Sequence, residues 1–216
     1  MSVVSIIIMA FVFFFAITVH EAAHGWAALK LGDPTAYNLG RVSLNPIVHI
    51  DPIGTIIFPI MLIVMRAPIL FGWAKPVPVN PLNLRNPQRD NLLISAAGPL
   101  SNLTVAFLAF FGLIIIKSLT PNAFAEKGVL FYLVSGIFSI LYYTVFINII
   151  LAIFNLIPIP PLDGSGILMG LLSEEAAQKY DRIRPYGFII IILLLMTGIL
   201  GRIFVLIKSI LDFLIF

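Results

Sequence analysis

The chain has 216 residues, of which 60% are hydrophobic and 11% are charged, and its mean hydropathy is +1.08. Soluble domains average roughly 45–50% apolar and about 25% charged residues, so the composition indicates a membrane protein and excludes an ordinary soluble domain. The chain has no cysteine, which excludes disulfides, cysteine zinc sites and thiol nucleophiles. Basic residues beside membrane spans account for the net charge of +3, and no nucleic-acid partner is expected.

The first predicted element is an apolar helix from Val3 to about Leu31, long enough to span a membrane. It is followed by Gly32-Asp33-Pro34, a plausible helix stop. No basic residue precedes the apolar run and no small-residue cleavage pattern follows it. We therefore expect a retained span instead of a cleaved signal peptide.

The pattern His20-Glu21-Ala22-Ala23-His24 lies near the end of this predicted helix. Residues four apart project from one helix face, so the two imidazoles can bind one Zn²⁺. Glu21 can then reach a water on that metal as general base. The pattern alone is common, but ionisable side chains are costly in a membrane span, which makes this cluster a candidate functional site.

The middle of the chain is polar from Thr35 to Pro52, apolar from Ile53 to Phe71, and rich in proline and asparagine from Gly72 to Arg89. The apolar part is short for a span and is interrupted by Gly54, Pro59, Arg66 and Pro68. We expect it to enter the membrane and return, which irregular backbone does only where it lines a protein cavity. The stretch Val77–Pro81 reads as an extended stretch or a loop.

Three further apolar stretches follow, Leu92–Ile116, Val129–Leu156 and Tyr186–Phe216, and the last is one long helix or two short ones broken near Gly198 and Gly201. The sequence thus predicts an all-α polytopic membrane protein with about four to five transmembrane helices. A re-entrant or extended segment at about 53–81 follows the first helix. Residues 1–216 are expected to form a single membrane-embedded domain.

A catalytic zinc needs a third protein ligand besides two histidines and keeps one open position for water. Asp163 is the best candidate, because it directly follows a span on the proline-rich turn Ile157–Leu162, which can fold back against the membrane face. His20, His24 and Asp163 can meet on the same side of the membrane only if the segment 53–71 does not cross it.

The distribution of basic residues supports the same topology. The side expected to hold the metal is much richer in lysine and arginine, so the positive-inside rule makes it cytoplasmic. That side carries Lys30, Arg41, Arg66, Lys75, Arg85, Arg89, Lys179, Arg182 and Arg184, and the opposite loop carries Lys117 and Lys127.

The chain resembles the site-2 protease family of intramembrane zinc metalloproteases, in a compact form without a PDZ or CBS domain. The resemblance covers most of the chain up to about Gly166, and Leu162 stands where the family often has proline. The segment Asn45–Pro52 also resembles the family. The main matching motifs, in order, are His20-Glu21-x-x-His24, Gly98-Pro99 with Asn102, and Asn155-x-x-Pro158-x-Pro160-x-x-Asp163-Gly164.

The resemblance implies hydrolysis of a peptide bond in or near a transmembrane helix of another protein. One Zn²⁺ per chain would be bound by His20, His24 and Asp163, and Glu21 would activate the water. The expected partners are a transmembrane-helix substrate and the lipid bilayer, in a multi-pass protein of the cell membrane with its active site towards the cytoplasm. The oligomeric state is not predicted.

Several alternatives stay open at this point. The His/Glu/Asp cluster could belong to a metal or proton transporter, although its polar residues gather at one depth, whereas a pathway needs them across the bilayer. A non-catalytic adaptor would not need an intact motif. Asn155 could bind substrate backbone or stabilise the oxyanion, or it could join helices. His49 and Asp51 could support the metal ligands, gate substrate or stabilise a loop.

Overall fold

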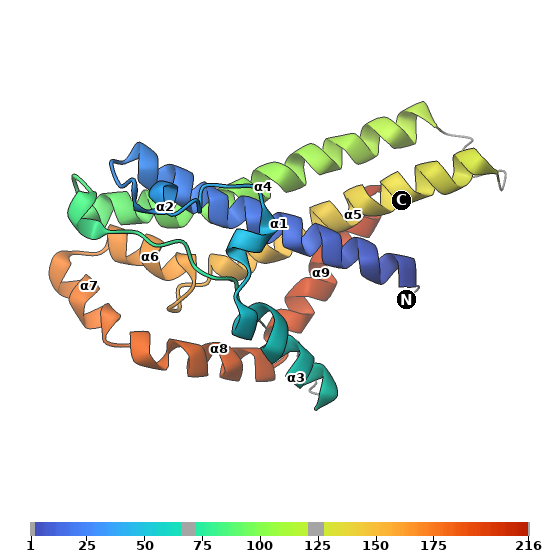
Figure 1. Ribbon diagram of the computed structural model, residues 1–216. Helices are drawn as coiled ribbons and strands as arrows, with labels where there is room; N and C mark the ends of the chain where they lie inside the picture. The colour runs from blue at the N-terminus through green and yellow to red at the C-terminus, as the bar shows by residue number, and fades with distance from the viewer. Residues whose placement is uncertain (1–2, 66–71, 121–127, 216) are drawn as a thin grey trace.

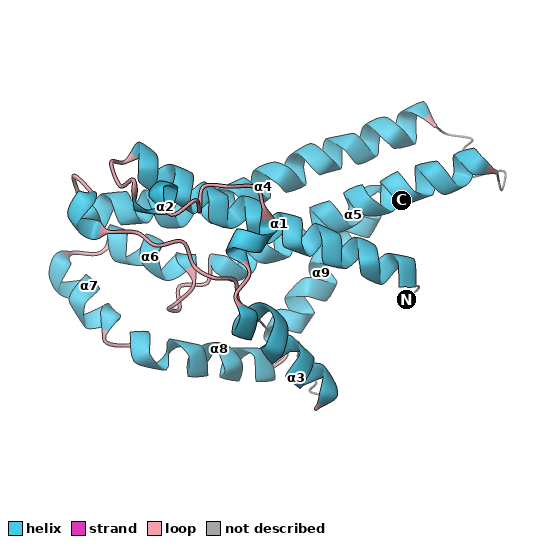
Figure 2. Ribbon diagram, in the orientation of Figure 1, coloured by secondary structure: helices cyan, strands magenta, loops and turns pink. Residues whose placement is uncertain are grey.

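The computed structural model describes residues 3–65, 72–120 and 128–215, and these residues form helices and connecting loops without a strand among them (Figure 2). The all-α prediction is therefore confirmed. The elements in chain order are α1 (Val3–Lys30), α2 (Thr35–Asn38), η1 (Pro46–His49), η2 (Pro52–Ile57), α3 (Phe58–Val64), η3 (Pro81–Asn83), α4 (Pro87–Leu119), α5 (Val129–Asn155), α6 (Asp163–Leu171), α7 (Glu174–Asp181), η4 (Arg184–Tyr186), α8 (Gly187–Met196) and α9 (Ile199–Ile215).

Three long helices, α1, α4 and α5, run side by side and form the body of the protein (Figure 1). Each is long and apolar enough to cross a membrane, and the bent pair formed by Glu174–Met196 and α9 makes up to four such spans in the described part of the chain. Small residues are buried within these helices, namely Ala16, Ala106, Ala109 and Ala152. In lipid, helices associate through close packing, which small side chains permit.

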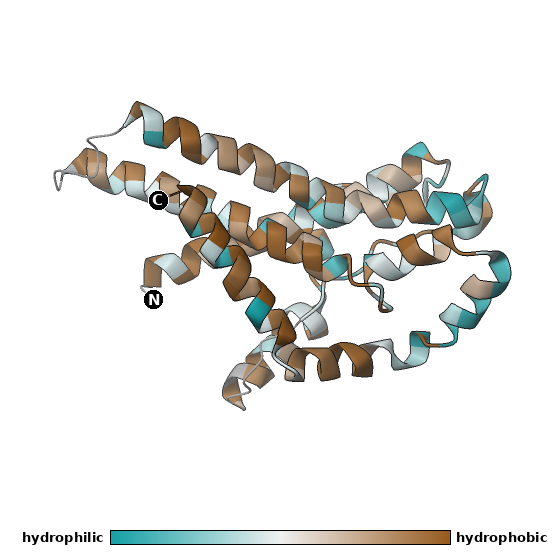
Figure 3. Cartoon of the chain, turned by 180° about the vertical axis from the view of Figure 1, so that it is seen from behind, coloured by the Kyte–Doolittle hydropathy of each residue, from teal (hydrophilic) through white to brown (hydrophobic). Residues whose placement is uncertain are grey.

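Polar residues gather at one end of the molecule, where α7 and the start of α4 lie, while the long helices are mostly hydrophobic (Figure 3). At this end α4 begins at Pro87, earlier than the predicted Leu92. The Asn86 side chain accepts a hydrogen bond from Arg89 N at 3.2 Å and so caps the helix. Proline is also favoured at the first helical position, because its missing N–H has no intrahelical partner there.

The chain after η1 leaves the body of the protein and comes back beside its starting point, an arrangement that fits the re-entrant or extended segment predicted at about 53–81. The part that leads away from η1 consists of η2 and α3, which together form a short apolar helix. The Asp51 side chain caps its start by accepting hydrogen bonds from Ile53 N and Gly54 N at 2.9 and 2.7 Å. The backbone N–H of Trp73 donates to Gly54 O at 3.1 Å, so the chain comes back to the place it left. The predicted interruptions at Arg66 and Pro68 lie outside the described residues. We call residues 72–80 the return segment.

The C-terminal apolar stretch is two helices and not one. Helices α8 and α9 meet at Gly198, whose φ of +72° lies in the left-handed region that favours glycine, and the two arms are bent by 61°. Gly201, the other predicted break, lies inside α9. Lys117 Nζ, near the end of α4, donates to Ile215 O, so α9 ends beside the end of α4 that is distant from α6.

The return of the chain between Gly54 and Trp73 can be tested by labelling. Because the chain has no cysteine, single cysteines can be introduced at the exposed positions Leu44, Leu82 and Leu119. We expect a membrane-impermeant maleimide to modify Leu44→Cys and Leu82→Cys from the same side of sealed vesicles, and Leu119→Cys from the other. Labelling of Leu44→Cys and Leu82→Cys from opposite sides would mean that the intervening segment crosses.

Candidate metal centre

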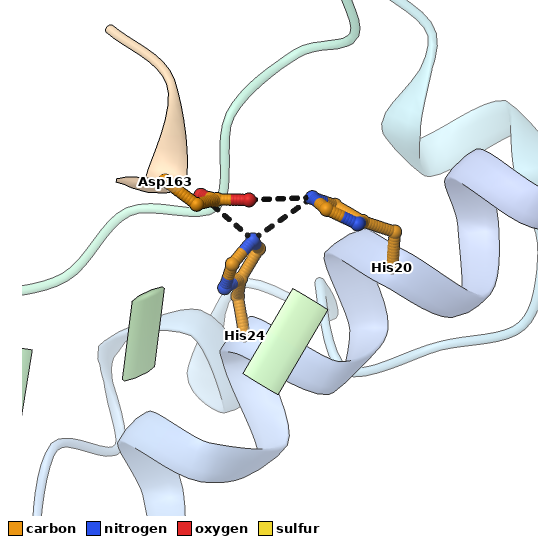
Figure 4. A group of neighbouring side chains, drawn as sticks. All are labelled: His20, His24 and Asp163. Carbon is orange, nitrogen blue, oxygen red and sulfur yellow. Dashed lines mark hydrogen bonds and ion pairs between the residues drawn. The ribbon is translucent and has the colours of Figure 1, made fainter. Parts of the chain in front are cut away.

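Helix α1 and the start of α6 bring His20, His24 and Asp163 together (Figure 4). His20 Nε2 lies 3.0 Å from Asp163 Oδ2, and His24 Nε2 lies 3.2 Å from Asp163 Oδ1. The two Nε2 atoms are 3.1 Å apart. Both histidines are buried. The three side chains predicted as metal ligands thus point at one another from two elements that are far apart in the sequence.

Helix α4 holds the outer nitrogen of each imidazole. His20 Nδ1 lies 2.6 Å from Asn102 Oδ1, and His24 Nδ1 lies 2.7 Å from the backbone carbonyl oxygen of Ile94. Because these oxygens accept hydrogen bonds, we assign the ring proton of each histidine to Nδ1. The lone pair of each Nε2 then faces the centre of the cluster, which is the orientation that a metal ligand requires.

The spacing of the three donor atoms fits a metal ion. Tetrahedral Zn²⁺ with bonds of about 2.0–2.1 Å places neighbouring ligand atoms about 3.3 Å apart, close to the 3.0, 3.1 and 3.2 Å in the cluster. Asp163 Oδ2 is buried and has no hydrogen-bond donor. Two nitrogen lone pairs and a carboxylate facing one another repel unless a cation or proton lies between them, so the donor set suits Zn²⁺.

A pair of buried amides, Asn102 and Asn148, supports His20, and only Asn102 belongs to the motifs identified in the sequence. Asn102, 0% exposed, donates from Nδ2 to Asn148 Oδ1 at 2.7 Å and to Ala16 O at 3.2 Å. Asn148 donates in turn to Thr144 O at 2.8 Å. An unsatisfied buried amide costs about 1–3 kcal/mol, so this chain fixes which way the Asn102 oxygen points. An asparagine in the middle of the apolar stretch Val129–Leu156 was the signal that could have identified Asn148.

Gly98 allows α4 to approach the two imidazoles. A Cβ built at Gly98 would overlap His24 Nε2 and lie 2.6 Å from His20 Cε1. Any larger residue at this position would displace α4 or the rings. Gly98 of the Gly98-Pro99 motif is therefore required for the close packing of α4 against the two histidines.

Asp163 reaches the cluster because the chain turns tightly after α5 and packs α6 onto α4. Ser165 Oγ donates to Leu162 O at 2.7 Å and stabilises the first turn of α6. A Cβ at Gly166 would overlap Ser95 Oγ, so α6 lies directly against α4 at this level. The carboxylate at the first position of α6 is thereby placed beside the histidines of α1.

Glu21 lies half-buried next to the cluster and is bound by the return segment. Its Oε2 accepts a hydrogen bond from Val77 N at 3.2 Å. Further along, Asp33 accepts from Asn80 N and from Asn83 Nδ2, both at 2.7 Å, and its side chain is 0% exposed. Burial raises the pKa of Asp33, but the hydrogen bonds from Asn83, Thr35 and Asn80 outweigh it and leave the pKa lowered.

The side-chain hydrogen bond of Asn155 goes to its own helix, where Nδ2 donates to Leu151 O at 3.0 Å, and not to His20, His24 or Asp163. His49 is buried, with Nε2 2.9 Å from Ser43 O, and its backbone oxygen accepts from Lys75 N at 3.0 Å. Together with the helix-capping contacts of Asp51, these bonds favour the loop-stabilising alternative for His49 and Asp51.

Replacing Gly98 with alanine is expected to weaken zinc binding about 10–100-fold, the range seen when the support of a metal ligand is removed. The added methyl group meets both imidazoles. Zinc per chain would be measured after dialysis against a zinc buffer. Gly136→Ala is the matched control, since a Cβ there meets no atom within 4 Å. Equal zinc affinity in both variants would contradict the close approach of α4.

Comparison with known proteins identifies the family of this chain. Residues 8–198 match the model of peptidase family M50. The Bacillus subtilis protein YwhC, named as a zinc metalloprotease, is 38% identical over 180 residues, which are 83% of this chain and 76% of YwhC. Rip2 of Mycolicibacterium smegmatis, with the same description, is 27% identical over 187 residues, 87% of this chain and 66% of Rip2.

A shorter match is MJ0611 of Methanocaldococcus jannaschii, also named as a zinc metalloprotease, which is 39% identical over 79 residues, 37% of this chain and 34% of MJ0611. No solved structure matches significantly. The family model covers most of the chain, and YwhC is similar over more than two thirds of its own length. The site-2 protease motifs in the sequence of this chain agree with these matches. The chain therefore belongs to peptidase family M50, a family of zinc-dependent membrane peptidases.

Proposed function

We propose that this protein is an intramembrane zinc metalloprotease that hydrolyses a peptide bond in or near a transmembrane helix of a membrane-protein substrate. The observation that carries the proposal is the convergence of His20, His24 and Asp163 at 3.0–3.2 Å, with Glu21 on the same helix as the histidines. One Zn²⁺ per chain would be held by these three side chains, with Glu21 as the catalytic base. Residues 1–216 would form one membrane-embedded domain, which the packing of α1, α4, α5 and α9 supports.

Zinc bound there would supply a water of lowered pKa and polarise the scissile carbonyl. Glu21 then acts as general base, taking a proton from the attacking water at the oxygen that Val77 does not occupy. The same carboxyl group passes the proton to the nitrogen of the leaving amine. His20 and His24 would hold the zinc through Nε2, while Asn102 and the Ile94 carbonyl orient the two rings through Nδ1.

The substrate helix has to unwind before its peptide bond can be attacked, and we propose that the return segment holds it in extended form. The N–H groups of Trp73, Lys75 and Val77 bond inward, to Gly54 O, His49 O and Glu21. In extended chain successive residues alternate between two edges, so the residues between them face the other edge, where a substrate strand can be added. Asn155 donates one N–H of its amide to Leu151 O, and its second N–H is the donor that would contact substrate or the oxyanion.

We further propose that the protein lies in the cell membrane with the metal centre towards the cytoplasm. Most of the described basic residues lie on the elements at the end that contains α2, α6 and α7, whereas Lys117 lies near the other end and Arg202 and Lys208 lie on α9. The described basic residues at the metal end are Lys30, Arg41, Lys75, Arg85, Arg89, Lys179, Arg182 and Arg184.

Metal content tests the ligand set. We expect about one zinc per chain in detergent-purified protein, and its loss or strong reduction in Asp163→Asn, because the carboxylate is one of three ligands. Asp181→Asn, at a carboxylate paired with Arg184 on the surface, is the control and should keep its zinc. A chelator should abolish peptidase activity, and added Zn²⁺ should restore it. Full zinc occupancy in Asp163→Asn would show that the third ligand lies elsewhere.

Substitution of the base separates catalysis from metal binding. Glu21→Gln is expected to retain zinc and to lower kcat by at least about 100-fold, the lower range of a general-base contribution. Cleavage of a reconstituted transmembrane substrate would be followed beside Glu175→Gln, a change at an exposed carboxylate. A Glu21→Gln protein that cleaves at the wild-type rate would rule out this mechanism.

A further inference from the structure

One buried cation near the metal centre has no part in the chemistry described above. Arg41 is only 6% exposed, and its Nη2 donates to the backbone carbonyls of Lys75 and Pro76 at 2.5 and 3.3 Å. A buried guanidinium is costly unless it is hydrogen-bonded, and here its hydrogen bonds go to the return segment instead of a carboxylate. The position of Arg41 is therefore coupled to the position of that segment.

The contact with Pro76 leads directly to Glu21. The carbonyl of Pro76 and the N–H of Val77 belong to one peptide unit, which is planar because of its partial double bond. Arg41 bonds to the oxygen of this unit, and Glu21 accepts from its N–H at 3.2 Å. A rigid plane thus connects the cation to the carboxylate, with the positive group at the oxygen end of the peptide dipole and the negative group at the hydrogen end. Each hydrogen bond polarises the other.

The packing of α1 allows this arrangement. A Cβ at Gly25, one turn after Glu21, would lie 3.0 Å from Val42 Cγ2 and 3.5 Å from Val77 Cγ1. The residue that follows Arg41 and the residue that holds Glu21 therefore both lie on the helix at Gly25. Beyond Val77, Asp33 anchors the return segment through Asn80 N. The Pro76–Val77 peptide unit lies between two anchored points.

We propose that Arg41 is a positioning residue for Glu21: it orients the Pro76–Val77 peptide unit so that the Val77 N–H holds the carboxylate in place for proton transfer. Burial lowers the pKa of Arg41, and the nearby charge of Glu21 partly opposes that effect, which agrees with the proximity of the two groups. The proposal rests on the function proposed above, because the effect of Arg41 is measured in the reaction that Glu21 serves.

A double-mutant cycle tests the connection. Val77→Pro removes the N–H and keeps the Pro76 carbonyl, and Arg41→Gln removes the cation. We expect each change to lower kcat by about tenfold or more, as for loss of a hydrogen bond to a charged group, with KM little changed. Because both act on the same contact, the double variant should be no slower than the slower single variant. Arg41→Lys should restore part of the rate, since it keeps the charge without the planar fork.

The controls separate positioning from folding and from metal binding. Arg85→Gln, at an exposed arginine just after the return segment, should leave kcat unchanged. All variants should hold the zinc content of the wild type, because α4 supports the histidines independently of Arg41. If Arg41→Gln does not fold, Arg41→Lys replaces it in the cycle.

Three results would overturn the inference. The first is a wild-type kcat in Arg41→Gln or, where that variant does not fold, in Arg41→Lys, and the second is additive losses of rate in the double variant. The third is a raised KM at unchanged kcat, which would assign Arg41 to substrate binding. None of these would affect the proposed function. Failure of the proposed function would appear instead as activity in Glu21→Gln or as no zinc in the wild type.

Discussion

The need to partner polar groups inside an apolar body determines this structure. Each imidazole of α1 must bond its outer nitrogen to an acceptor on α4, and each inner nitrogen must face Asp163. An unpartnered ring nitrogen or amide in these surroundings costs about 1–3 kcal/mol, so displacing α4 is unfavourable for both histidines at once. The contact at Gly98, the amide pair of Asn102 and Asn148 and the tight turn before α6 all follow from satisfying these groups.

A second constraint concerns the position of the polar chain on either side of the apolar arm formed by η2 and α3. The polar chain between α1 and α4 has to remain beside the end of α1 that holds Glu21, although an apolar arm interrupts it. Hydrogen bonds at Gly54 and His49 bring the chain back, and Asp33 secures it further on. As a result, the Glu21 carboxylate, the proposed base, is held by backbone that is distant in sequence but tightly anchored. An anchored base would lose less rotational freedom in the reaction.

Much of the candidate site could be predicted from the sequence, because its signals are local. Four-residue spacing places His20 and His24 on one helix face, and Asp163 follows a span directly. The partners that come from the backbone could not be predicted: any residue has a carbonyl, so nothing marks Ile94, and nothing marks the Val77 N–H as the donor to Glu21. Helix α4 begins at Pro87, before the apolar stretch that starts at Leu92, because the Asn86 side chain caps the helix although the residues after Asn86 are polar.

The prolines of the return segment have a consequence for association between copies. Pro76 and Pro78 occupy positions that alternate with the inward-bonding residues, so the outer edge lacks N–H donors at both positions. The Pro76 carbonyl is already bonded to Arg41. Two such edges pair poorly with each other, because neither can supply ladder donors at its two proline positions. The prolines thus disfavour self-templated pairing of this edge between copies, a protection that exposed edges require.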